Sequence, residues 1–354
     1  MQSAATLPLG VSRQLRQGVV IPAHPLALNR NRKLDERRQR ALSRYYIAAG
    51  AGGLAVGVDL TQPEIHEPKA GLLRPVLELA AEALNADEAS RGPRLVRVAG
   101  VAGRTRHALA EARLAADLGY HAALLQVGAW RNTPLPKVLA HARAVAEVIP
   151  LFGIEGDRRL DASFWRGFLE IDNVAAVRVP PGGRYQTLEA ARSLAESGRG
   201  RAIPLYAGSG DQIVQDLVTA FSFSQNGAAR TVRIVGGLLD EWAVWTRRAE
   251  THLRECHRVA AKQQVPVSLS LLTLGAQFAD ASAAILDAAN GFAGRVAGVH
   301  EVLRRQGLLE GCWFLDPRRR LSAGQAIEID RAYSSYRHLN DDPFVAQHLS
   351  SWLG

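Results

Sequence analysis

The sequence of 354 residues contains very little cysteine and no long apolar run. Cys256 and Cys312 are its only cysteines, which excludes a disulfide framework and indicates a reducing compartment. No apolar stretch approaches the roughly 18 residues of a membrane-spanning helix. Residues 1–17 lack the basic start and apolar core of a signal peptide. We therefore expect a cytoplasmic protein that makes no membrane contact.

Lysine is also scarce, although the chain has 43 basic residues against 34 acidic ones and a net charge of +9. Only four of the basic residues are lysine, and the rest are arginines spread along helix-like segments beside glutamates. No basic run interleaved with aromatic residues is present, which argues against nucleic-acid binding. A few well-placed arginines suit small anions better, because a guanidinium holds a carboxylate or phosphate with paired hydrogen bonds.

Short apolar runs alternate with amphipathic segments along most of the chain, which predicts eight strand–helix units. The expected strands cover residues 18–25, 52–58, 94–101, 121–127, 149–154, part of 173–183, 202–208 and 230–236. The expected helices cover residues 34–50, 71–85, 104–119, 135–148, 161–171, 187–198, 212–227 and 238–263. Strands joined by helices run parallel, and eight such units favour a closed (β/α)8 barrel. An open doubly wound sheet would need a glycine-rich turn after the first strand, and none is present.

This pattern of predicted elements divides the chain into three parts. We predict an N-terminal arm over residues 1–17, the barrel over 18–263 and a C-terminal helical extension over 264–354. Glycines that end helices and polar residues that cap them recur in the extension. We expect it to pack on the barrel.

Several stretches resemble the dihydrodipicolinate synthase and N-acetylneuraminate lyase family of barrel aldolases. Residues 18–42, "GVVIPAHPLALNRNRKLDERRQRAL", resemble the opening strand and first helix of the family. Residues 97–130, "RVAGVAGRTRHALAEARLAADLGYHAALLQVGAW", resemble its third and fourth units, and 173–183, "NVAAVRVPPGG", resembles its sixth strand. The likeness runs from Gly18 through the eighth unit and weakly to Tyr336. It implies a barrel lyase that acts on a small keto acid without a cofactor, as a homodimer or homotetramer.

The positions that carry the family's chemistry differ in this chain. The resemblance places Arg178 where the family has the lysine that forms a Schiff base with its keto acid. A guanidinium stays protonated and is not a usable nucleophile. Phe152 takes the place of a proton-relaying tyrosine, and "GVDLTQPE" at 57–64 lacks the family's paired threonines. Of the other lysines, only Lys69 follows a strand closely enough to serve as a displaced Schiff-base lysine.

Candidate site residues lie at the carboxyl ends of the predicted strands, where barrel enzymes place their active sites. The candidates for catalysis are Arg178, His24, Asp59 and Glu155, and those for substrate binding are Arg158, Trp130, Phe152, Thr61 and Ser209. Arg178 either grips a carboxylate or phosphate or is paired with a nearby acid such as Glu155 or Asp211.

His24 has two interpretations, a general base or a hydrogen-bonded loop residue. Together with Asp59, Glu64, His66 and Glu67 it could form a metal site, but the spacing matches no strong ligand signature, and we predict none.

The leading hypothesis is a barrel protein that binds a small carboxylate or keto acid and works as an aldolase- or lyase-type enzyme without a Schiff base. Two alternatives stay open. One is a catalytically silent homologue that binds a ligand or a partner. The other is a conventional pyruvate-dependent lyase with a displaced lysine.

Overall fold

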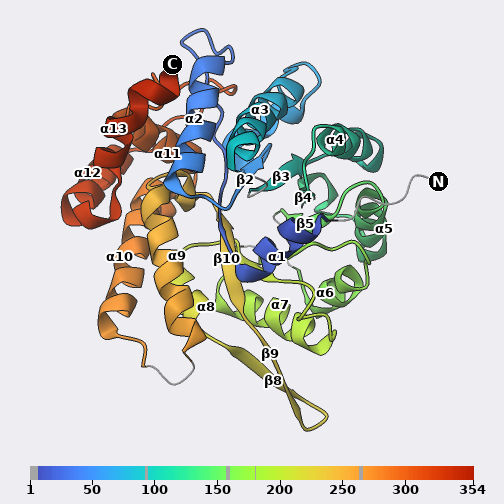
Figure 1. The fold of residues 1–354 in the computed structure, drawn as a ribbon. Helices are drawn as coiled ribbons and strands as arrows, with labels where there is room; N and C mark the ends of the chain where they lie inside the picture. The colour runs from blue at the N-terminus through green and yellow to red at the C-terminus, as the bar shows by residue number, and fades with distance from the viewer. Residues whose placement is uncertain (1–6, 92–94, 157–159, 180, 263–265) are drawn as a thin grey trace.

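The computed structural model describes residues 7–91, 95–156, 160–179, 181–262 and 266–354 (Figure 1). Its centre is a set of eight parallel strands. These are β1 (Val20–Pro22), β2 (Gly53–Val56), β3 (Val96–Val101), β4 (Ala122–Gln126), β5 (Leu151–Glu155), β6 (Val177–Val179), β7 (Leu205–Ala207) and β10 (Ile234–Leu239). They pair in the orders β1-β10-β7-β6 and β2-β3-β4-β5. Single parallel bridges, Ala23 with Ala55 and Leu151 with Val174, join the two sheets, and the predicted (β/α)8 barrel is confirmed.

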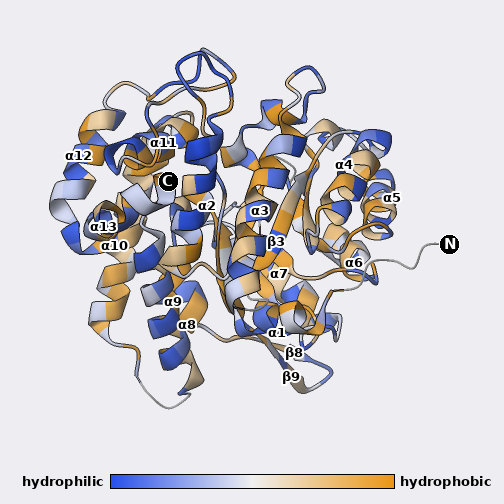
Figure 2. Ribbon diagram, turned by 45° about the horizontal axis from the view of Figure 1, so that its top comes forward, coloured by the Kyte–Doolittle hydropathy of each residue, from blue (hydrophilic) through white to orange (hydrophobic). Residues whose placement is uncertain are grey.

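Helices follow the strands and cover the barrel from outside. They are α2 (Glu36–Ala49), α3 (Leu73–Arg91), α4 (Thr105–Asp117), α5 (Leu135–Ala146), α6 (Ala162–Leu169), α7 (Arg184–Glu196), α8 (Ile213–Val218) and α9 (Thr246–Ala261). In Figure 2 these helices alternate between hydrophilic and hydrophobic residues, as expected for helices that bury one face. In the described part of the chain, no helix is both long enough and apolar enough to cross a membrane.

The seventh and eighth units differ from the prediction. The helix expected over 212–227 ends at Val218, and an antiparallel hairpin of β8 (Phe221–Gln225) and β9 (Ala228–Val232) follows it. Asn226 and Gly227 form its turn with φ angles of 51° and 76°, the left-handed pair that a two-residue hairpin turn requires. The hairpin projects from the barrel (Figure 1). The helix expected over 238–263 begins only at Thr246, because β10 extends to Leu239.

The C-terminal extension is helical, as predicted. Its helices are α10 (Leu269–Ile285), α11 (Arg295–Arg305), α12 (Gln325–Ser335) and α13 (Asp342–Leu353), which lie together beside α2 and α9 (Figure 1). The buried carboxylate of Asp341 accepts hydrogen bonds from the Tyr45 hydroxyl at 2.8 Å, the Gln306 amide at 2.9 Å and the Arg247 backbone N–H at 3.2 Å. One acid therefore ties the extension to α2 and α9.

The N-terminal arm contains a helix that the sequence pattern did not predict, α1 (Leu9–Gln17). The Tyr206 hydroxyl donates to the carbonyl of Leu15 at 2.9 Å, and Gln14 donates to the carbonyl of Gly52, just before β2, at 3.2 Å. These contacts place α1 across the amino-terminal ends of the strands. The opposite end of the barrel, where the strands finish, is left for the site.

Candidate functional site

Arg178 lies on β6 and is buried, with an exposed fraction of 3%. Its Nε donates to the carbonyl of Leu238 at 3.1 Å, and its Nη2 donates to the carbonyl of Gly208 at 3.2 Å. Its Nη1 lies 2.8 Å from Oε1 of Glu155, at the end of β5. Of the two interpretations of Arg178, pairing with a nearby acid is therefore present, and the acid is Glu155.

A second arginine reaches the same place from the C-terminal extension. Arg295, at the start of α11, forms an ion pair with Asp59, which follows β2. Its Nε lies 3.8 Å from Oδ2 of Asp240, which follows β10. The extension thus supplies a cation to the carboxyl ends of the barrel strands.

These groups surround a cavity of about 430 Å³ at the barrel mouth. Its wall on the barrel side includes Glu155, Arg178, Ser209 and Asp240. On the other side it is closed by residues of the extension: Leu286, Gly291, Phe292, Ala293, Arg295, Val296 and Arg319. The cavity combines arginines, carboxylates and apolar surface, as ligand sites commonly do.

Two buried atoms beside this cavity have unmet hydrogen-bonding capacity. Among the described residues, neither Oε2 of Glu155 nor Nη1 of Arg178 has a hydrogen-bond partner. Nη1 is close enough to Oε1 of Glu155 for an ion pair, but the contact lacks hydrogen-bond geometry. A buried polar atom without a partner costs about 1–3 kcal/mol. A polar ligand in the cavity would supply the missing partners.

The pKa of Glu155 is raised to about 7, mainly by burial and to a smaller extent by the carboxylates of Asp59 and Asp240, against the opposing effect of Arg178. Burial likewise raises the pKa of Asp240 to about 6, although Arg295 lowers it. Carboxyl groups whose pKa lies near neutrality can both donate and accept a proton at physiological pH. The mouth therefore contains two groups suited to acid–base chemistry.

The raised pKa of Glu155 predicts how stability depends on pH. Because the pKa is higher in the folded state than its ordinary 4.5, its stabilisation is complete below pH 4.5 and is lost as the pH rises through about 7. We expect the free energy of unfolding in urea to fall by about 2 kcal/mol from pH 5.5 to pH 7.5 through this group. Glu155→Gln should remove that part of the fall, whereas Glu310→Gln, at an exposed glutamate, should not. Equal pH profiles for wild type and Glu155→Gln would contradict the assignment.

His24 is fully buried, and both of its ring nitrogens have partners. Nε2 lies 2.8 Å from the Ser43 hydroxyl, and Nδ1 lies 3.0 Å from the Gln39 amide. Burial lowers its pKa to about 4, so the ring is neutral. The Thr61 hydroxyl donates to the carbonyl of His24 at 2.7 Å and accepts from the N–H of Gly57 at 2.9 Å. Both residues hold the ends of β1 and β2 in place, and neither lines the mouth cavity.

Two further candidates also lie away from the cavity. The Phe152 ring packs edge-on against Tyr206, with 5.0 Å between ring centroids, in the barrel interior. The Trp130 indole donates to the carbonyl of Gly103 at 3.1 Å and stacks on His141 at 4.3 Å. The Phe152 ring therefore packs in the barrel interior, and the Trp130 ring packs among the loops.

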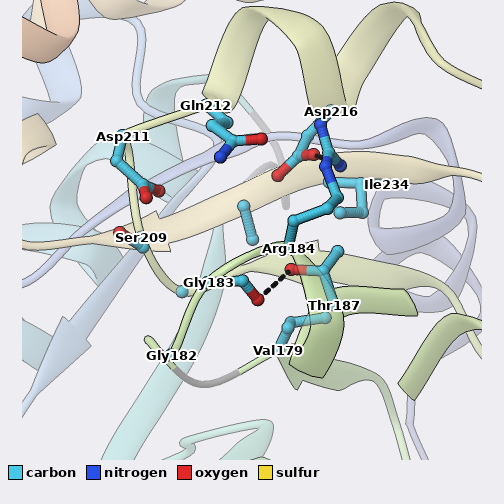
Figure 3. A pocket seen from close by; sticks show the side chains of 12 residues that line it. Val179, Gly182, Gly183, Arg184, Thr187, Ser209, Asp211, Gln212, Asp216 and Ile234 are labelled. Atoms are coloured by element: carbon cyan, nitrogen blue, oxygen red, sulfur yellow. Dashed lines mark hydrogen bonds and ion pairs between the residues drawn. The ribbon is translucent and has the colours of Figure 1, made fainter. Parts of the chain in front are cut away.

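Ser209 does line the mouth cavity, and it also lines a small neighbouring pocket (Figure 3). There Arg184, in the first turn of α7, forms an ion pair with Asp216 of α8. Asp211 lines this pocket and is not the partner of Arg178. Arg158 lies outside the described residues.

The other residues considered as metal ligands pair with other side chains. Glu64 pairs with Arg319 at 3.0 Å, and His66 lies 2.9 Å from a carboxylate oxygen of Glu111. Among the residues that the structure describes, no three or more histidines, cysteines, aspartates or glutamates form a group that could hold a metal ion.

The four lysines are all on the surface. Lys69, the candidate for a displaced Schiff base, pairs with Glu67 at 2.7 Å, and its side chain has an exposed fraction of 84%. Lys33, Lys137 and Lys262 are exposed as well. No lysine lines the mouth cavity.

Of the mouth residues that the structure describes, Glu155, Arg178 and Ser209 were predicted from the sequence, whereas Asp240, Phe292 and Arg295 are among those that were not. Asp240 comes directly after β10. The strand predicted over residues 230–236 ends before Leu239, so the sequence pattern did not place Asp240 at a strand end. Phe292 and Arg295 belong to the extension, and no local signal in the sequence indicates that they meet the barrel.

No protein-family model matches the sequence, and no curated protein sequence matches it. Solved structures do match its fold. N-acetylneuraminate lyase from Fusobacterium nucleatum is 14% identical, with a TM-score of 0.68 over 90% of this chain and 99% of the lyase. Dihydrodipicolinate synthase from Acinetobacter baumannii, solved with pyruvate, is 16% identical, with a TM-score of 0.70 over 90% of this chain and 98% of the synthase. The synthase from Agrobacterium tumefaciens is 17% identical, with a TM-score of 0.69 over 91% and 99%. The chain therefore has the fold of the dihydrodipicolinate synthases and N-acetylneuraminate lyases.

Proposed function

We propose that this protein binds a small carboxylate, such as a keto acid, in the barrel mouth and acts on it as an aldolase- or lyase-type enzyme without a Schiff base. The observation that carries the proposal is the pair of buried, unsatisfied atoms beside the cavity, Nη1 of Arg178 and Oε2 of Glu155. An anionic oxygen would satisfy the guanidinium, and a hydroxyl group would satisfy the carboxylate. All four lysines lie in described segments of the chain and none lines the cavity, which supports chemistry without an imine.

The proposed reaction needs only proton transfers and one carbon–carbon bond. In the cleavage direction, the carboxylate of Glu155 removes the hydroxyl proton of an aldol, and the carbon–carbon bond breaks as the new carbonyl forms. The electron pair moves into the other fragment as an enolate, whose oxygen Arg178 stabilises. Glu155, now protonated, then returns this proton to the enolate carbon and becomes a carboxylate again. The step balances without an external oxidant or reductant.

A second candidate is a protein that binds the carboxylate without acting on it. This alternative is favoured by the two backbone carbonyls that already occupy Nε and Nη2 of Arg178. With Nε and one N–H of Nη2 engaged and Nη1 facing Glu155, few donors are left for an oxyanion, which is a weak catalytic provision compared with paired donors.

Hydrogen–deuterium exchange at the carbon next to the carbonyl separates the two candidates. The enzyme should exchange the methyl protons of pyruvate or the C3 protons of 2-oxobutyrate in D₂O, measured by NMR. Glu155→Gln should slow this exchange by about 100-fold or more while binding persists, and Glu310→Gln should leave it unchanged. Binding without exchange would favour the silent protein. If neither acid binds, the carboxylate proposal fails.

Borohydride trapping tests the route without an imine. We expect no stable mass adduct when the wild-type protein is incubated with pyruvate and borohydride, because none of its lysines lines the mouth cavity. A stoichiometric adduct on any lysine would establish a Schiff base and overturn the proposed route, even if the exchange experiment succeeds.

A further inference from the structure

A second hollow lies at the end of the barrel opposite the mouth. It has a volume of about 280 Å³, and its lining includes Leu205 at the start of β7 and Val235 near the start of β10. Arg16, near the end of α1, borders it from one side. Thr231 and Val232 of the projecting hairpin border it as well. Figure 1 shows α1 in front of the barrel strands and the hairpin projecting from the barrel below it.

Three arginines line this hollow: Arg16, Arg201 and Arg233. Arg16 donates to the Ser12 hydroxyl at 2.6 Å, and Arg233 donates to the carbonyl of Val218 at 3.5 Å. None of the three forms an ion pair with a carboxylate of the described residues, and no acid is among the lining residues. By contrast, the arginines of the mouth each face an acid. The hollow is therefore a locally uncompensated positive site.

The rest of the lining is apolar. Leu194, Ile203, Leu205 and Val232 are buried side chains of its wall. None of its lining residues is aromatic, so the hollow offers no surface on which a nucleic-acid base could stack. Its volume of about 280 Å³ lies just below the usual range of small-molecule sites, about 300–1,000 Å³.

We propose that this hollow binds a small organic anion, a phosphate monoester or a carboxylate with a compact apolar body. The guanidinium groups of Arg201 and Arg233 would hold the anionic group with charge-assisted hydrogen bonds, and the aliphatic wall would cover the body of the ligand. The site lies at the other end of the barrel from Glu155 and Arg178. Its ligand therefore binds independently of the mouth.

Isothermal titration calorimetry with phenyl phosphate and with benzoate tests this site and separates the two anionic groups. We expect saturable binding of at least one probe, tighter than that of inorganic phosphate because of the apolar wall. Arg201→Ala and Arg233→Ala should each weaken it about tenfold, which is the loss of one charge-assisted hydrogen bond of roughly 1.4 kcal/mol. Arg106→Ala removes the same charge from an exposed position on α4 and should leave binding within twofold.

Three results would overturn the proposal. One is the lack of saturable binding of either probe at millimolar concentration. Another is equal weakening by Arg106→Ala, which would indicate a general charge effect. The third is loss of binding in Glu155→Gln, which would place the probe in the mouth. Glu155→Gln also tests the proposed function, and it should slow exchange in the mouth while leaving binding in the hollow unchanged. The two readouts are separate, so failure of one proposal leaves the other standing.

Discussion

Arg178→Met is expected to lower the free energy of unfolding by about 3–5 kcal/mol at pH 8, the usual cost of removing one partner from a buried ion pair. The substitution leaves the Glu155 carboxylate in a buried mouth beside Asp59 and Asp240, both of which already raise its pKa. It also removes the donors for the carbonyls of Leu238 and Gly208. Urea denaturation followed by circular dichroism measures the loss.

The double variant Arg178→Met/Glu155→Met provides the control. Removing both charges leaves no buried ion without a partner, so we expect most of the lost stability to return. The loss in the single variant should also shrink at pH 5.5, because Glu155 can then become neutral by binding a proton. A double variant as unstable as the single one would show that the carbonyl contacts of Arg178, and not its pairing with Glu155, account for the effect.

The sequence allowed the pairing of Arg178 with Glu155 to be predicted as one possibility. Apolar runs predicted β5 and β6 as neighbouring strands, and neighbouring parallel strands bring their carboxyl ends together. Glu155 ends β5 and Arg178 is the second-last residue of β6, so pairing was one of two interpretations open from the start. The choice between pairing and ligand binding needed the structure, because it depends on which guanidinium nitrogens the carbonyls of Leu238 and Gly208 occupy.

The β8–β9 hairpin shows a different kind of error. "FSFSQ" alternates apolar and polar residues, and "NG" follows it at 226–227, which together are strong local signals for a hairpin. The helix predicted over 212–227 is present as α8 up to Val218 but was wrong beyond it, because the apolar spacing of its first half was extended across these signals. Arg295 is a third case: its contact with Asp59 joins segments that only tertiary packing brings together. No periodicity or spacing could have predicted that contact.

The extension that delivers Arg295 depends in turn on Asp341, and Asp341→Ala should lower the free energy of unfolding by about 3 kcal/mol. The substitution removes the acceptor of the Tyr45 hydroxyl and of the Arg247 backbone N–H. It also removes one of the two acceptors of the Gln306 amide, which still donates to Asp342. Each buried donor left without a partner costs about 1–3 kcal/mol, less whatever water can recover. Asp342→Ala is the matched control, because that partly buried acid accepts only from Gln306 and should cost under about 1 kcal/mol.

Hydrogen exchange should show where Asp341→Ala acts. If Asp341 is a tether, amides of α11 and α13 will exchange faster, while those of β3 and β4, which pair within the barrel, will keep their protection. Because α11 carries Arg295, loosening it should also weaken carboxylate binding in the mouth, whereas the arginine-lined hollow at the other end should bind its probe as before. Uniform acceleration across barrel and extension would contradict the tether, since it would mean that the two parts unfold as one unit and that Asp341 stabilises the whole chain.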